Sequence, residues 1–381
     1  MKKKIVFLTS QVIDARNYQR FDIDLFLKKD WDVKILYFKK DNFTNKKAYK
    51  NTNKNFKIIT VKKNKEIFNF LKNNKNFIYI DIMRHSIKSI FLNIFLCMRK
   101  NLRITLIHSP LPIPHMKKDF YYFFKIFFNL VLLKDYIIIN THKYLDKIIF
   151  TNNTYSFFSG TEGLKLTSAK KKIPIHSFDY DFFIKDSNKI SNNKKKNIVF
   201  IDQYEDNHPD YKSMNISTVS KKKYYRSLNN FFNNIESKTK KKVVIAAHPR
   251  APNSRTFGKR KIYYNKTYKL IKESYLCLTH DSAAINFAIA HEKPLLFFYT
   301  NEIVKKRYVM VSQIKAMSRE LGIESINIDQ DLNKINYLKY LKIKKSRYQK
   351  YFYKYISTNK NGKITVMKIL EKNLSKLNIF N

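Results

Sequence analysis

The chain has 381 residues, and its 76 Lys and Arg residues against 29 Asp and Glu give a formal net charge of +47. Its length predicts two domains, and a hydrophobic content of 44% excludes an intrinsically disordered chain. Two cysteines are too few for a disulfide framework or a thiolate metal site.

The first half of the sequence alternates short apolar runs with helix-like segments. Apolar runs at 4–10, 31–38, 76–82 and 103–109 predict buried strands, and the spacing of apolar residues predicts helices over 17–30 and 87–101. This alternation is typical of a parallel sheet covered by helices. The apolar stretch from Phe120 to Asn140 is interrupted by Lys125, Lys134 and Asp135, so we expect a buried helix there and not a membrane span.

A lysine-rich polar segment over 166–196 is typical of an interdomain linker, and the alternation then restarts. Strands are predicted over 197–202, 241–247, 275–280 and 293–300, and helices over 223–239, 265–274 and 282–292. The sequence therefore predicts a first domain over 1–165, a linker over 166–196, a second domain over 197–335 and C-terminal helices over 336–381. Both domains are expected to be Rossmann-like.

The high positive charge is compatible with nucleic acid or with an anionic membrane surface. The lysines lie along the whole chain, however, in a composition also rich in Asn, Ile, Phe and Tyr, as in proteins of AT-rich genomes. No RNA-recognition or zinc-finger signature is present. We therefore expect no nucleic-acid partner, and an acidic substrate or an anionic inner-membrane surface explains the charge instead.

Two predicted strands of the second domain end on polar residues. His248, Pro249 and Arg250 follow one strand, and His280, Asp281 and Ser282 follow another, where Ser282 could cap the next helix. Ligands of parallel α/β sheets bind at the carboxyl ends of the strands, so these residues are candidates for holding a phosphate. The alternative is structural: a core strand that leaves the sheet through a turn, and an ordinary helix cap.

A third strand end carries scarce carboxylates. Asp202, Glu205 and Asp206 follow the first strand of the second domain and are candidate catalytic groups. The alternative is an acidic loop that balances a basic protein. His208-Pro209 nearby and His108 in the first domain are secondary candidates, and no set of His, Asp or Glu has metal-ligand spacing.

The His248-Pro249 pair followed by Ser282 resembles the His-Pro and Ser motifs of bacterial sialyltransferases and of Kdo (3-deoxy-manno-octulosonate) transferases of capsule and lipopolysaccharide synthesis. The likeness covers 197–300. Capsule β-Kdo transferases also carry a Gln-x-x-x-Asp motif, from which this sequence departs, because Asn207 stands four residues after Gln203.

This resemblance implies a GT-B fold, in which two Rossmann-like domains face each other across a cleft, with the acceptor on the first domain and a CMP-sugar on the second. The low glycine count, 5 in the chain, and the missing Gly-x-Gly-x-x-Gly turn disfavour NAD and P-loop nucleotides. The donor's own carboxylate would be held by nearby cations, for which the candidates are Arg255, Lys259 and Arg260.

The expected protein is a cytoplasmic, metal-independent glycosyltransferase that needs no cofactor and transfers an acidic sugar, Kdo or sialic acid, from a CMP-sugar. Its partners would be a lipid-linked or growing surface polysaccharide and the anionic inner membrane, which it would contact peripherally. Two alternatives remain. One is a UDP-sugar-dependent GT-B transferase or an epimerase-type enzyme, and the other is a non-catalytic basic protein that binds RNA or membranes.

Overall fold

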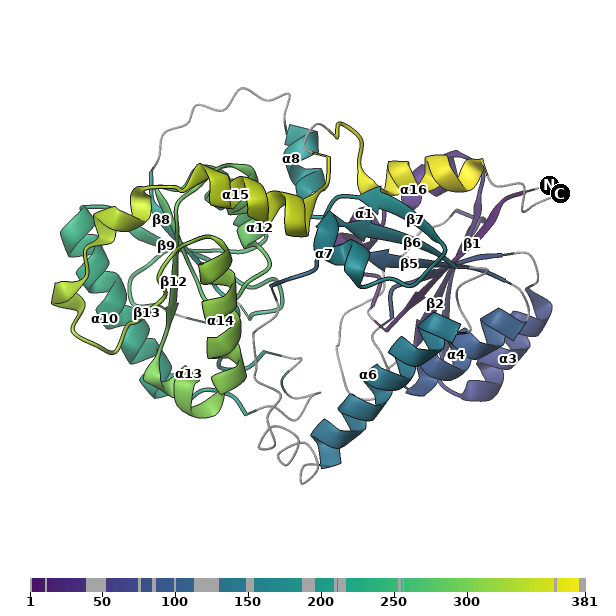
Figure 1. The fold of residues 1–381 in the computed structure, drawn as a ribbon, viewed down its shortest axis with the longest axis horizontal. Coiled ribbons are helices and arrows are strands. Elements are labelled where there is room, and N and C mark those ends of the chain that lie inside the picture. The colour runs from purple at the N-terminus through teal and green to yellow at the C-terminus, as the bar shows by residue number, and fades with distance from the viewer. Residues whose placement is uncertain are drawn as a thin grey trace. The chain divides into compact units, whose positions relative to one another are not determined.

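The structure is a computed structural model that describes residues 2–10, 12–38, 53–74, 77–83, 87–98, 101–112, 130–148, 154–186, 196–208, 211, 217–252, 255, 257–359 and 362–376. The chain forms two compact units. The first comprises 1–110, 117–178 and 357–381, and the second comprises 111–116 and 179–356. Figure 1 shows the two units, each with a central sheet covered by helices.

The first unit contains a sheet of seven parallel strands in the order β3-β2-β1-β4-β5-β6-β7. The strands are β1 (Lys4–Thr9), β2 (Asp32–Phe38), β3 (Phe56–Val61), β4 (Ile78–Asp81), β5 (Leu102–Ile107), β6 (Thr154–Ser159) and β7 (Lys171–Ile175). The helices are α1 (Ala15–Arg20), α2 (Ile23–Lys28), α3 (Asn64–Asn73), α4 (Ile87–Met98), α6 (Leu130–Ile148), α7 (Gly160–Lys165) and α16 (Val366–Ser375).

The helices of this unit cover both faces of its sheet (Figure 1). One core contains residues of α1, α2 and α16 against the sheet, and a second core contains residues of α3 and α4. The helix predicted over 17–30 is divided into α1 and α2, because Asp22 has a φ of 43° and interrupts the helical backbone. The predicted strands over 4–10, 31–38, 76–82 and 103–109 correspond to β1, β2, β4 and β5.

The lysine-rich segment predicted to be a linker over 166–196 has regular structure in its first half. Residues Lys171–Ile175 form β7, which pairs with β6 in register from Tyr155↔Lys171 to Ser159↔Ile175. As an edge strand it is largely exposed, and edge strands carry Lys and Pro where central strands carry apolar residues. The units divide between Phe178 and Asp179, which lies within the segment predicted as the linker.

The second unit contains six parallel strands in the order β10-β9-β8-β11-β12-β13. The strands are β8 (Ile198–Ile201), β9 (Val243–Ala246), β10 (Ile262–Tyr263), β11 (Leu276–Thr279), β12 (Leu295–Tyr299) and β13 (Ile326–Asn327). The α-helices are α8 (Tyr180–Asp186), α10 (Lys221–Thr239), α11 (Thr267–Lys272), α12 (Ile285–Ala290), α13 (Asn301–Lys306), α14 (Tyr308–Glu320) and α15 (Lys345–Tyr351). All four predicted strands of this half are present as β8, β9, β11 and β12.

The helical tail is divided between the two units. Helix α15 belongs to the second unit, whereas α16 belongs to the first, where Val366, Met367, Leu370 and Leu374 join its core. The Lys29 ammonium donates to the Glu371 carboxylate at 2.6 Å, which ties α16 to the residue after α2. Helix α16 thus completes the core to which β1, α1 and α2 contribute.

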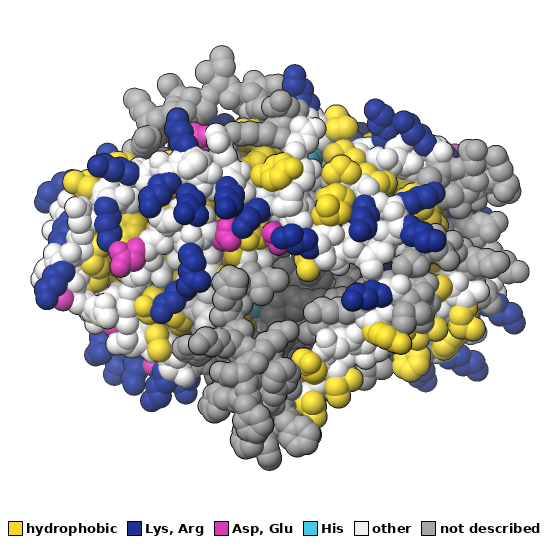
Figure 2. Space-filling view, viewed as in Figure 1, with side chains coloured by type: hydrophobic (Ala, Val, Ile, Leu, Met, Phe, Trp, Pro, Cys, Tyr) yellow, Lys and Arg dark blue, Asp and Glu magenta, His cyan; other side chains and the backbone are white. Residues whose placement is uncertain are grey.

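No helix in the described part of the chain is long and apolar enough to cross a membrane. Of the apolar stretch from Phe120 to Asn140, residues 130–140 lie in α6 and residues 120–129 lie outside the described residues. Lys and Arg side chains are scattered over the face shown in Figure 2 and are not gathered in one stripe.

Because α16 packs into the core of the first unit, a substitution in α16 should destabilise that unit. Leu370 is fully buried, so Leu370→Ala should destabilise this unit by roughly 2–5 kcal/mol. The chain's one tryptophan, Trp31, is buried in the same core and reports unfolding of this unit by its fluorescence in urea. As a control, Ile364→Ala, at a half-exposed position, should change the free energy by about 0.5 kcal/mol or less. An unchanged Trp31 transition in Leu370→Ala would contradict this packing.

Candidate functional site

The sheet of the second unit has a topological switch point between β8 and β11. In chain order its strands follow the pattern 3-2-1-4-5-6, so the connections from β8 run to one side and those from β11 to the other. Ligands of such sheets bind beside the carboxyl ends of the strands at this point. The residues that follow β8, β9 and β11 are those singled out in the sequence, at Asp202, His248 and His280.

Asp202 connects the ends of β8 and β9. Its carboxylate pairs with the Arg255 guanidinium, including a contact of 3.2 Å from Nη2 to Oδ1, and both side chains are almost completely buried. The other oxygen, Oδ2, also accepts from the backbone N–H of His248 at 3.2 Å. Arg255 donates further to Asp206 Oδ1 at 3.2 Å and to the Tyr225 hydroxyl on α10. Asp202 and Asp206 are therefore counter-ions of one buried arginine.

His248, Arg250 and His208 lie together beyond the end of β9. The backbone N–H of Arg250 donates to His248 Nδ1 at 3.2 Å, so the proton of the neutral His248 ring is on Nε2. The Arg250 guanidinium lies 3.2 Å from His208 Nε2, and because a guanidinium can only donate, His208 accepts there. The rings of His208 and His248 are 4.8 Å apart. These three side chains form a partly exposed group of donors at the strand ends.

Glu205 is fully buried and belongs to a separate ion pair. Its carboxylate pairs with Arg307 and accepts from the Tyr211 hydroxyl at 2.7 Å. Burial raises the pKa of Glu205 to about 8, although the neighbouring Arg307 acts to lower it. The Arg307 guanidinium also lies over the Tyr211 ring at 3.7 Å from the centroid. The three predicted catalytic carboxylates are thus each held by an arginine inside the protein.

Gln203 and Asp281 pair across the switch point. Gln203 Nε2 donates to Asp281 Oδ1 at 2.6 Å, and the Asp281 backbone N–H donates to Gln203 Oε1 at 3.1 Å. Asp281 is partly exposed, and the burial of its carboxyl raises its pKa. Next to it, Ser282 Oγ accepts from the Ala284 backbone N–H at 3.2 Å within the turn before the helix. The prediction that Ser282 caps this helix is wrong, because the helix begins at Ile285 with Ala284 as its N-cap and no side chain caps it.

His280 has a different environment from the one we expected for a nucleotide ligand. Its side chain is fully buried, with Nδ1 2.7 Å from the Phe298 carbonyl and Nε2 2.8 Å from the Tyr224 hydroxyl. Nδ1 therefore carries the proton and Nε2 accepts, as in a neutral imidazole. Both ring nitrogens are bonded to protein groups, so His280 supports the strand end from inside and we give it no ligand contact.

The cations expected to hold a donor carboxylate are also placed differently. Arg255 is buried in its pairs with Asp202 and Asp206. Arg260 pairs with Glu236 at 2.7 Å, and Glu236 in turn accepts from the N–H of Val243 at the start of β9. Arg260 therefore lies toward the amino ends of the strands, opposite the candidate site. Lys259 is exposed. None of the three is carried into our functional proposal.

Sequence reasoning ranked His208 too low and did not single out Arg307. The sequence feature that could have indicated His208 is the second His-Pro dipeptide, which lies beside a strand end. Its contact with His248 joins residues that are 40 positions apart in the sequence. Arg307 follows α13 and meets Glu205 across 102 residues, which no local pattern indicates. Among the described residues, no group of three or more His, Cys, Asp or Glu could hold a metal ion.

No protein-family model and no curated protein matches the chain. Solved structures do match it over almost its whole length. The wall teichoic acid polymerase TagF is 12% identical with a TM-score of 0.56, over 98% of this chain and 90% of that one. The chain has the GT-B fold. The GT-B-fold UDP-GlcNAc 2-epimerase from Methanocaldococcus jannaschii, in complex with UDP-GlcNAc and UDP, is 12% identical with a TM-score of 0.51, over 98% and 99% of the two chains.

Burial of His280 predicts a specific pH dependence of stability. Burial lowers the pKa of His280 from 6.5 to about 4. Because the folded-state pKa lies below the unfolded value, this contribution is fully present above pH 6.5 and is lost as the pH falls toward 4. The wild type should therefore lose about 2 kcal/mol through this residue between about pH 7 and pH 5.

The test compares the wild type with His280→Gln by urea denaturation at both pH values. The variant lacks the titrating ring, so its deficit in the free energy of unfolding should shrink on acidification. A deficit that is the same at both pH values would show that the His280 ring does not titrate between the folded and unfolded states as described.

Proposed function

We propose that the protein is a glycosyltransferase that uses a nucleotide sugar bound at the switch point of the second unit. The observation that carries this proposal is the group formed by His248, Arg250 and His208 at the strand ends. Asp202 and Asp206 are paired with Arg255, and Glu205 is paired with Arg307, so each carboxylate of this set already has a cationic partner beside the group. An anion such as a phosphate is the ligand that such donors bind.

The proposed donor carries one phosphate between its nucleoside and its sugar, as a CMP-sugar does. His248 Nε2–H and the Ser282 turn would bind that phosphate, and no glycine-rich loop is present to cradle a diphosphate. Arg250, which donates to His208, would also bind the carboxylate of an acidic sugar of the Kdo or sialic-acid type. This role replaces the one that the sequence suggested for Arg255, Lys259 and Arg260.

The proposed reaction is a single displacement at the anomeric carbon. A hydroxyl oxygen of the acceptor forms a bond to that carbon while the bond from carbon to the phosphate oxygen breaks, and the electron pair leaves with CMP. Donors at His248 and the Ser282 turn stabilise the charge that develops on the phosphate. Asp281 accepts the hydroxyl proton, because it is a partly exposed carboxylate held by Gln203 at the switch point, and burial raises its pKa although the nearby Arg307 acts to lower it.

The acceptor in this proposal is a growing or lipid-linked surface polysaccharide, reached at an anionic inner-membrane surface that attracts the lysines. A second candidate function is a UDP-sugar enzyme, either a transferase or an epimerase. The similarity in fold to an epimerase in complex with UDP-GlcNAc and UDP favours keeping it as the competing hypothesis. Transfer to an acceptor, measured with labelled sugar, separates the transferase from the epimerase.

Substitution of His248 should separate binding from folding. His248→Ala should weaken CMP binding by on the order of 1.5–3 kcal/mol, the contribution of a hydrogen bond to a charged group, without loss of the folded state. His291→Ala is the matched control in the same unit, because His291 follows α12 and bonds to the Tyr268 hydroxyl instead. Asp281→Asn should keep CMP affinity and lose transfer. Calorimetric titration and transfer assays measure these effects, and an unchanged CMP affinity in His248→Ala would return His248 to a structural role.

The donor hypothesis predicts a ranking of nucleotides. CMP should raise the melting temperature more than UDP or GDP at equal concentration, because the site provides ligands for one phosphate. At a hundredfold excess over its dissociation constant, CMP should add about 2.7 kcal/mol to the stability of the folded state. Thermal denaturation with each nucleotide measures this. Stronger stabilisation by UDP, with turnover of a UDP-sugar, would replace the CMP assignment by the competing hypothesis.

A further inference from the structure

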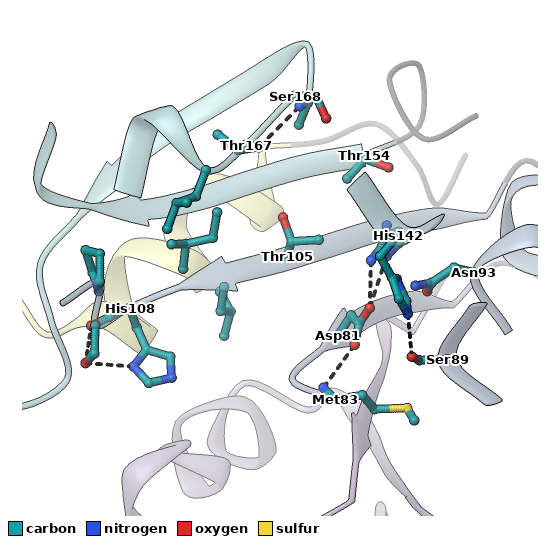
Figure 3. A pocket seen from close by; sticks show the side chains of 17 residues that line it. Asp81, Met83, Ser89, Asn93, Thr105, His108, His142, Thr154, Thr167 and Ser168 are labelled. Carbon is teal, nitrogen blue, oxygen red and sulfur yellow. Dashed lines mark hydrogen bonds and ion pairs between the residues drawn. The ribbon is translucent and has the colours of Figure 1, made fainter. Parts of the chain in front are cut away.

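The first unit contains a cavity of about 430 Å³, which is a size typical of small-molecule sites. It lies on the face of the sheet formed by β4, β5 and β6, between that face and side chains of α4 and α6, and the loop between α7 and β7 borders it (Figure 3). The described residues that line it all belong to the first unit. The cavity therefore shares no described lining residue with the candidate site of the second unit.

The sheet face beside the cavity is apolar at β1 and becomes polar toward β6. Residues that pair across β1, β4, β5 and β6 show this change; one such set is Val6, Tyr79, Arg103 and Thr154, and the next on the same face is Leu8, Asp81, Thr105 and Ser156. Buried parallel sheets are normally apolar on both faces, as these sets are at β1. Buried polar residues cost stability unless they are hydrogen-bonded. Here Arg103 pairs with Asp81 and Thr105 Oγ1 donates to the Tyr155 carbonyl, whereas Ser156 Oγ has no partner among the described residues.

The two charged groups at the cavity neutralise each other. Arg103 donates from Nε and Nη2 to Asp81 Oδ2 at 3.2 and 2.8 Å, and each side chain is 8% exposed. The backbone N–H of Met83 donates to the other Asp81 oxygen at 3.0 Å. A charged ligand would have to compete with this pair, whereas an uncharged ligand would not. The cavity thus favours an uncharged ligand.

Asn93 is the residue that points to a ligand. It lies on α4 with 1% of its surface exposed and lines the cavity, where Figure 3 shows it beside His142. Neither its Oδ1 nor its Nδ2 has a hydrogen-bond partner among the described residues. Unsatisfied buried carboxamides are rare because their desolvation costs free energy. A carboxamide offers one acceptor and two donors, which match two adjacent hydroxyl groups of one molecule.

The remaining lining has the composition of a site for a polyhydroxylated ring. Ser89 Oγ and His142 Nε2 lie 3.0 Å apart beside Asn93, and Thr105 and Ser168 contribute further hydroxyl groups. Apolar side chains complete the wall and could cover the C–H face of a sugar ring; they include Met83, Leu106, Ile107 and Leu166. Hydroxyl and amide groups with an apolar surface fit a sugar better than they fit a phosphate or a metal ion.

We infer that this cavity is a binding site for an uncharged, hydroxyl-rich ligand of monosaccharide size, with Asn93 as its principal hydrogen-bonding residue. The inference goes beyond the proposed function, because it concerns the other unit and does not require a nucleotide. The ligand could be a sugar unit of the acceptor or a free sugar that regulates the enzyme, and both share this chemistry.

The test is saturation-transfer NMR on the full chain without nucleotide. The probes are D-glucose, D-galactose, D-mannose and N-acetyl-D-glucosamine, with D-glucuronate as the charged counterpart of glucose. At least one neutral sugar should receive saturation with millimolar affinity, and glucuronate should bind about tenfold more weakly than glucose if glucose binds. Asn93→Leu, which keeps the side-chain volume, should abolish the signal.

Asn140→Leu is the matched control, because Asn140 is exposed on α6 and bonds to the carbonyl of Tyr136 in its own helix. It should bind sugars as the wild type does. Thr105→Val removes another lining hydroxyl group and gives a second variant should Asn93→Leu fail to fold, which Trp31 fluorescence reports. The inference is overturned if no neutral sugar gives a signal that these two lining variants reduce, which is the result expected of a cavity filled by water alone.

Transfer assays then separate the two sources of the ligand. If the site holds a unit of the acceptor, Asn93→Leu raises KM for the acceptor and leaves KM for the donor unchanged. If it holds a free sugar, added sugar changes the transfer rate of the wild type and not that of Asn93→Leu. Because sugar binding is measured without nucleotide, failure of the donor hypothesis would leave this result interpretable.

Discussion

The buried ion pair of Asp202 and Arg255 organises the candidate site of the second unit. The guanidinium reaches Asp202 at the end of β8, Asp206 in the following loop and Tyr225 on α10, so three segments meet at one side chain. Asp202 also accepts from the backbone N–H of His248, which brings in the end of β9. Charges buried to this extent are tolerated because nearly every donor and acceptor is used, and removal of one partner would leave the other uncompensated. The position of His248 therefore depends on an ion pair that itself contacts no ligand in our proposal.

Because of this pairing, the charge at the candidate site does not follow from the net charge of the whole chain. The net charge of +47 comes from lysines spread along the whole sequence. At the strand ends, by contrast, Arg255 and Arg307 are paired with three carboxylates, and His248, Arg250 and His208 lie together beside them. Local pairing, and not the overall excess of lysine, sets the electrostatic environment of this group.

The two units share a topology but use their sheets differently. In both, the strands follow the order 3-2-1-4-5-6, with β7 added at the edge of the first unit. The second unit has a mainly apolar interior and concentrates its polar groups at the strand ends. The first unit also places polar groups on the face of its sheet, around Asn93 and the Arg103–Asp81 pair. In our proposals, these two kinds of polar site would hold ligands that differ in charge.

The sequence by itself determined most of the strands at the centres of both sheets. Apolar runs mark eight of them, because a central parallel strand is buried on both faces; these are β1, β2, β4, β5, β8, β9, β11 and β12. The sequence did not predict β6, which is central and buried along its length but has the mixed polar and aromatic sequence TYSFFS. Edge strands such as β7 and short strands such as β10 and β13 lack this signal, since they are partly exposed or only two residues long. The alternation of elements was thus enough to predict two Rossmann-like domains, but not strand β7 inside the predicted linker, where the units divide between Phe178 and Asp179.

For the site, the sequence determined which residues stand at the strand ends, because the end of an apolar run can be read locally. It could not determine which of them are available to a ligand. Arg255 and Asp202 meet across 53 residues, Arg307 and Glu205 across 102, and His280 is enclosed by Tyr224 and Phe298. Only the tertiary structure decided these partners, because a hydrogen bond between distant segments depends on how strands and helices pack in space and leaves no periodic trace along the chain.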